Sequence, residues 1–85
     1  MDVKVVRVLE AFRKDTGALV FDAPLVDLNL ETLQMIFDVP KSDPMYDCWP
    51  VKEEHVPLLR PHVDCSIDLD RYDYFVSAYT EPSVL

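Results

Sequence analysis

Prolines divide this chain of 85 residues into segments that can and cannot form regular secondary structure. A proline has no backbone N–H, so it interrupts both helices and central strands. Pro44 and Pro50 bracket the stretch MYDCW, which is therefore expected to form an irregular connection. Pro57 and Pro61 interrupt the next segment, which predicts a short, imperfect helix of about two turns. The longer regular elements are expected towards the two ends of the chain.

The first of these elements is a β-hairpin. Residues 3–12, VKVVRVLEAF, are rich in β-branched side chains and carry apolar residues on both faces, which predicts a strand away from the sheet edge. In the following RKDTG, Gly17 can take the left-handed conformation that closes a hairpin with a bulge. ALVFDAPL is predicted to return as the second strand, with Leu19, Phe21 and Ala23 on one face.

A helix and a last strand complete the expected fold. Asn29 suits the N-cap of a helix, and the apolar residues of the following LETLQMIF recur at helical spacing. Residues 71–80, RYDYFVSAYT, alternate as a strand does. The order ββααβ predicts an α+β fold, in which the N-terminal hairpin and the C-terminal strand form a small antiparallel sheet with two helices packed on one face. A brief strand at Trp49–Val51 or near Ile67–Leu69 could extend this sheet.

Length and composition limit the function classes. A single domain, residues 1–85, is expected to bury roughly 60–65% of its unfolded surface, which provides a thin core but no deep catalytic cavity. The single glycine excludes a glycine-rich phosphate loop. The N-terminus has no uninterrupted apolar run, so we expect neither a signal peptide nor a membrane span. In the cytoplasmic location that this implies, Cys48 and Cys65 would be free thiols.

The net charge of −8 is unevenly distributed along the chain. Residues 1–14 carry four basic and two acidic side chains, whereas residues 15–85 carry four basic and fourteen acidic ones. Neutralising phosphates requires clustered Lys and Arg, so nucleic-acid binding is disfavoured. An acidic surface suits a basic protein partner, whose approach it accelerates. The alternative is that the charge only keeps a small protein in solution.

Two arrangements of residues could support chemistry. Cys48, His55, His62 and Cys65 offer the ligands that zinc prefers, but their spacing, C-x6-H-x6-H-x2-C, lacks the tight cysteine knuckle of structural zinc sites. The alternative is a buried Cys48 that packs as a small hydrophobe, with both histidines exposed. Nucleophilic catalysis needs a Cys or Ser beside a base, and no G-x-S-x-G elbow is present. We therefore expect no metal, no cofactor and no enzymatic activity.

DPMYDCW is the stretch best suited to recognising a partner. Tyr46 stands between Asp43 and Asp47 in a segment bounded by prolines, and a rigid aromatic side chain among acids is typical of a hot spot for a basic protein. Trp49 is a further candidate, although it could instead cap one end of the core. The remaining partner-binding candidates are acidic side chains later in the chain: Glu53, Glu54, Asp68 and Asp70.

These motifs together resemble a known group of proteins. The chain reads R-V-x-E-x-F-x-K-x-T-G-x-L over Arg7–Leu19, L-E-x-L-x-x-I-F over Leu30–Phe37, D-P-M-Y-D over Asp43–Asp47 and Y-D-Y-F over Tyr72–Phe75. This pattern resembles a family of small acidic bacterial proteins associated with immunity in polymorphic toxin systems, including contact-dependent growth inhibition. The resemblance implies a cytoplasmic antidote, a monomer that binds one cognate basic toxin domain, often a nuclease, in a 1:1 complex. It would cover the active site or the substrate groove of that domain.

Two other function classes stay open. The protein could be a different acidic interaction module, such as a nucleic-acid mimic that inhibits another basic protein, or it could be a small metal or thiol enzyme. A mimic would compete with DNA for many basic proteins, whereas an immunity protein would bind one partner.

Overall fold

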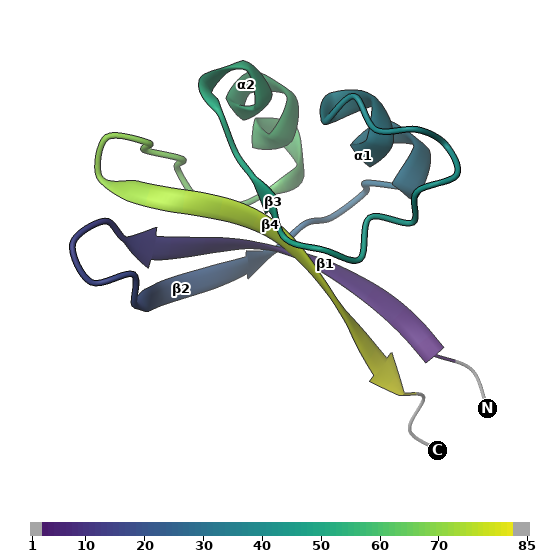
Figure 1. The fold of residues 1–85 in the computed structure, drawn as a ribbon, viewed down its shortest axis with the longest axis horizontal. Helices are drawn as coiled ribbons and strands as arrows, with labels where there is room; N and C mark the ends of the chain where they lie inside the picture. Colours follow the sequence, from purple (N-terminus) through teal and green to yellow (C-terminus); the bar gives the residue numbers. More distant parts are fainter. Residues whose placement is uncertain (1–2, 83–85) are drawn as a thin grey trace.

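A four-stranded antiparallel sheet is the frame of the protein (Figure 1). The computed structural model describes residues 3–82 of the chain. Across the sheet the strands follow the order β2-β1-β4-β3. Along the chain the elements are β1 (Val3–Arg13), β2 (Leu19–Pro24), α1 (Leu30–Ile36), β3 (Trp49–Pro50), η1 (Glu53–His55), α2 (Val56–Leu59), η2 (Arg60–His62) and β4 (Tyr72–Pro82), where η denotes a 3₁₀ helix.

Both α-helices lie over the same face of the sheet (Figure 1). The predicted α+β class is therefore confirmed. The predicted order ββααβ is incomplete, because β3 falls between the two helices and adds a fourth strand beside β4. This strand matches the brief strand that the sequence allowed at Trp49–Val51.

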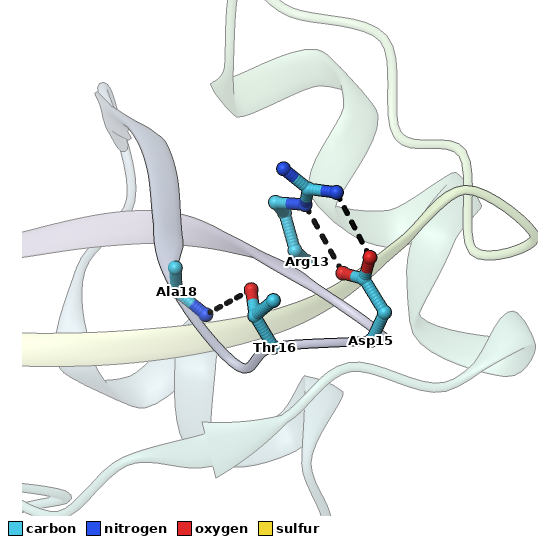
Figure 2. Close-up of polar contacts among 4 residues, drawn as sticks. All are labelled: Arg13, Asp15, Thr16 and Ala18. Atoms are coloured by element: carbon cyan, nitrogen blue, oxygen red, sulfur yellow. Dashed lines mark hydrogen bonds and ion pairs between the residues drawn. The ribbon is translucent and has the colours of Figure 1, made fainter.

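β1 lies between β2 and β4, as the apolar residues on both of its faces predict. The turn after it closes at Gly17, whose φ of +73° lies in the left-handed region that favours glycine. Figure 2 shows how side chains support this turn. Arg13 forms two hydrogen bonds with the carboxylate of Asp15, at 3.0 and 2.8 Å, and the N–H of Ala18 donates to Thr16 Oγ1 at 3.2 Å.

A β-bulge in the hairpin changes the face that Leu19 occupies. Ala11 is opposite Phe21, but the next residue, Phe12, is opposite Leu19, so β2 holds one extra residue at this point. Because side chains alternate along a strand, the extra residue moves Leu19 to the face opposite that of Phe21 and Ala23. The prediction that these three share a face is therefore wrong at Leu19, which is 51% exposed.

The helices follow the predicted start and stop signals. The side chain of Asn29 accepts a hydrogen bond from the N–H of Thr32 at 2.8 Å and caps α1. The second helical segment is the short, imperfect helix that its prolines predict, an α-helix of four residues between two 3₁₀ helices. Pro57 and Pro61 stand in the first turns of α2 and η2, where a missing N–H breaks no hydrogen bond.

The core fills the space between the helices and the inner face of the sheet. Leu9 of β1 and Leu59 of α2 are fully buried, and Leu33 of α1 is 1% exposed. Met45, from the connection between α1 and β3, joins this cluster at 1% exposure. One residue of the proline-bounded stretch, Met45, is therefore part of the hydrophobic core. The whole cluster comprises Leu9, Ala11, Leu33, Met45, Val51, Val56, Leu59, Val63, Tyr74 and Val76.

Candidate functional site

Arg7 of β1 holds the middle of the connection between α1 and β3. Its Nη2 donates a hydrogen bond to the carbonyl oxygen of Pro44 at 2.9 Å, and its Nη1 donates to that of Met45. The guanidinium carbon lies 5.8 Å from the centre of the Tyr46 ring, within the range of a cation–π interaction. Burial lowers the pKa of Arg7, and Tyr46 partly offsets that effect. One cation thus ties this loop to the sheet.

The same loop is also held from α1. Gln34 is 4% exposed, and its Nε2 donates to the carbonyl oxygens of Lys41 and Asp43, at 3.1 and 2.7 Å. The carboxylate of Asp43 accepts a hydrogen bond from the N–H of Met45 at 2.9 Å. Met45 itself has a φ of +55°, a conformation that non-glycine residues rarely adopt. Contacts from two elements therefore fix the shape of the loop.

The predicted recognition residues of this loop lie in different surroundings. Tyr46 is 62% exposed, and Asp47 is exposed as well. Asp43 is half-buried and engaged in the loop's own hydrogen bonding. Trp49 packs on the core side, with its ring centre 6.3 Å from that of Phe37, and its buried Nε1 has no hydrogen-bond partner among the described residues. The structure thus places Tyr46 and Asp47 at the surface and Trp49 against the core.

The other acidic candidates form a second surface region. Glu53, Asp68 and Asp70 line a shallow depression of about 350 Å³ together with Arg60, between the helical segment that starts at η1 and the loop before β4. Glu54 is exposed but does not line this depression. In Figure 1 the loop before β4 lies at the opposite end of the long axis from the loop between α1 and β3. The predicted binding residues therefore occupy two separate regions.

The cysteines and histidines do not form a metal centre. Within residues 3–82, no three His, Cys, Asp or Glu side chains lie close enough together to hold a metal ion. Cys48 and Cys65 are both free thiols, and Cys48 is exposed. His55 is 9% exposed, and its Nδ1 accepts a hydrogen bond from the N–H of Lys52 at 3.0 Å. The prediction of a buried Cys48 with exposed histidines is therefore wrong for Cys48 and for His55.

Sequence reasoning missed the face of the sheet that the helices leave uncovered. Val8 is 5% exposed yet lies outside the core cluster, because it points to this other face. Phe12 and Phe75 pack edge to face there, with ring centres 5.6 Å apart. We call this surface the open sheet face and define it by Val6, Val8, Glu10 and Phe12 of β1, Leu19 and Asp22 of β2, and Asp73, Phe75, Ser77 and Tyr79 of β4.

One signal in the sequence could have revealed this face. β1 carries apolar residues on both sides, which correctly predicted a central strand. Two short helices, however, have only enough surface to cover one side of a sheet. The second apolar row of the strand was therefore a sign of an uncovered surface as well as of a central position.

Comparison with known proteins gives a family for the chain. None of the helices within the described part of the chain has the length and apolar character needed to cross a membrane. A search of curated proteins finds no match to the chain. A family model described as a domain of unknown function, DUF7683, matches residues 6–77 of the 85. Since the match covers the hairpin, both helices and most of the last strand, the chain belongs to the DUF7683 family.

Proposed function

We propose that the protein binds a basic toxin domain, of the nuclease type for example, and neutralises it by covering its active site or substrate groove. The observation that carries this proposal is Tyr46, an aromatic side chain 62% exposed on a loop that Arg7 and Gln34 hold in place. A side chain whose backbone is already ordered loses little entropy on binding, which is why rigid aromatic residues make effective anchors.

Charge supports a basic partner. The net charge of −8 gives long-range attraction to a positively charged domain, and Asp47 stands directly beside the exposed tyrosine. The acidic depression at the other end of the molecule adds to this field without needing to touch the partner. A monomer in a 1:1 complex is the simplest assembly that uses these features.

The surroundings of the thiols favour binding over catalysis. Cys48 Sγ lies 3.2 Å from Ser77 Oγ, and the Ser77 hydroxyl donates to the carboxylate of Glu10. The hydrogen bonds of the two histidines go elsewhere, since His55 accepts from Lys52 and His62 donates to the carbonyl oxygen of Val26. Among the described residues no hydrogen bond joins either imidazole to a thiol, so no formed thiol–base pair supports catalysis.

The experiment is a protection assay in bacteria. The C-terminal domain of a secreted protein encoded directly upstream of this gene is expressed alone and together with the protein. Growth arrest by the domain alone and recovery on co-expression are expected, with no protection against unrelated basic nucleases. Failure to protect would overturn the proposal, and equal protection against unrelated basic nucleases would point instead to a general nucleic-acid mimic.

A further inference from the structure

The open sheet face, which carries both apolar and acidic side chains, lies on the side of the sheet away from the helices (Figure 1). Leu19 and Tyr79 are each 51% exposed on it, and Phe12 and Phe75 are half-buried beside them. Phe12 and Phe75 also line a hollow of about 290 Å³ with Gly17, Cys48 and Asp73. Exposed apolar side chains beside a hollow are typical of a surface that receives side chains from another molecule.

The charges on this face select the kind of partner. Glu10 and Asp22 are directly opposite each other on neighbouring strands, and like charges in that position repel. Neither carboxylate forms an ion pair within the described residues, where the two ion pairs are Arg13–Asp15 and Lys14–Asp73. Ser77 donates a hydrogen bond to Glu10 and so holds this carboxylate on the face. Lys or Arg side chains of a partner would relieve the repulsion.

The open sheet face meets the loop that carries Tyr46 at the uncovered edge of β4. β3 pairs with only two residues of β4, Phe75 and Val76, so the rest of that edge is uncovered by β3. Beyond β3, Tyr46 and Tyr79 line one hollow of about 450 Å³ together with Val5 and Ala78. A partner seated over this edge would contact both tyrosines.

We propose that the open sheet face is the main contact surface for the basic partner, which places apolar side chains on Phe12, Phe75 and Leu19 and basic side chains on Glu10 and Asp22. This inference rests on the proposed function and assigns its interface to a surface that extends beyond the predicted loop. A second copy of the chain is a poorer occupant, because each copy carries a net charge of −8 and the two acidic faces would repel.

The test compares two leucines of equal exposure. Leu19 on the open sheet face and Leu58 on the helical side are each 51% exposed. The partner probe is the upstream-encoded toxin domain in a catalytically inactive form, titrated by calorimetry. Leu19→Ser and Tyr79→Ser should each raise Kd about tenfold or more, as the loss of an apolar anchor does, whereas Leu58→Ser should leave Kd unchanged. Thermal melts check that each variant folds, and Leu19→Thr replaces Leu19→Ser if the serine variant does not melt cooperatively.

Asp22→Asn gives a second readout that a purely structural role would not produce. Removing one of two opposed carboxylates should raise Tm, because the repulsion with Glu10 disappears. The same change should raise Kd about threefold or more, because a basic side chain of the partner no longer has the Asp22 carboxylate to pair with. A variant that is more stable and binds worse supports the inference, and one that is more stable and binds equally well counts against it.

The outcomes separate this inference from the proposed function. If wild-type protein does not bind the toxin domain, the proposed function and the inference fail together. If wild-type protein binds while Leu19→Ser and Tyr79→Ser bind equally tightly, only the assignment of the open sheet face is overturned. Sedimentation that shows a dimer of the protein alone, abolished by Leu19→Ser, would make a second copy the occupant and also overturn the inference.

Discussion

His55 links the folding of the protein to pH. Its ring lies 4.3 Å from that of Phe37, and its Nδ1 accepts the hydrogen bond from Lys52. Burial lowers the pKa of His55 below its ordinary value of 6.5, and the nearby Glu54 partly offsets this effect. The unfolded chain therefore takes up the proton first as the pH falls. As the pH falls from the ordinary pKa to the lower folded-state pKa, the free energy of unfolding therefore decreases. Above the ordinary pKa, His55 has no effect on it.

His55→Gln should remove this part of the pH dependence. Glutamine can still accept the hydrogen bond from the N–H of Lys52, but it does not titrate. Urea unfolding at pH values from 8 to 5, in steps of about half a unit, measures the free energy of unfolding of both proteins. The wild-type protein should lose more stability below its ordinary histidine pKa than the variant. Parallel curves for the two proteins would contradict the role of His55.

Tyr46 and Trp49 should separate binding from stability. Tyr46→Ala is expected to cost on the order of 2 kcal/mol of binding free energy, as truncated aromatic hot spots do, with little change in Tm. Trp49→Ala should destabilise the fold by about 3–5 kcal/mol, because the indole packs against the core. Calorimetric affinities and thermal melts of both variants provide the measurement. A well-folded Tyr46→Ala protein with wild-type affinity would remove the loop from the interface.

At the scale of elements, local signals predicted most of the fold. The branched side chains of β1, the left-handed Gly17 and the cap at Asn29 act within a few residues, so the sequence reveals them directly. The bulge beside Leu19 and the short β3 depend on pairing with distant residues. Trp49, for example, is opposite Val76, and this register has no local signal.

The candidate site was predicted less completely than the fold, for a related reason. Proline and acidic residues correctly marked Tyr46 and Asp47 as surface positions. The same pattern could not show that Asp43 is engaged inside the loop, since that depends on its hydrogen bond to the N–H of Met45. The open sheet face was missed because burial of a strand's second side depends on how many elements the whole chain can place over it.

The loop between α1 and β3 should lose its fixed shape when Arg7 is changed. Arg7→Lys keeps the charge but loses the fork that reaches two carbonyl oxygens, and we expect a cost of about 1–2 kcal/mol in stability. Arg13→Lys is the matched control. Its fork contacts exposed Asp15, so a change of less than about 0.5 kcal/mol is expected. Hydrogen exchange at the Met45 amide should become faster in Arg7→Lys but not in Arg13→Lys. Unchanged protection of this amide in Arg7→Lys would contradict the role of Arg7 in fixing the loop.

At the scale of the whole molecule, charge and apolar surface have separate tasks. We expect the net charge of −8 to attract the proposed basic partner from a distance. The open sheet face and Tyr46 meet at the edge of β4 that β3 leaves uncovered, where we expect them to bury apolar area once contact is made. For the proposed complex we therefore expect steering to govern how fast it forms, and the aromatic and aliphatic contacts to govern how long it lasts.

The most direct measurement is the association rate of the protein with the proposed basic toxin domain as a function of salt. Stopped-flow mixing is carried out between about 20 and 200 mM salt, a range over which the Debye screening length decreases strongly. We predict a 1:1 complex whose association rate constant falls by about tenfold or more across this range, while its dissociation rate changes by less than about twofold. The absence of a complex, or an association rate that is independent of salt, would contradict the account.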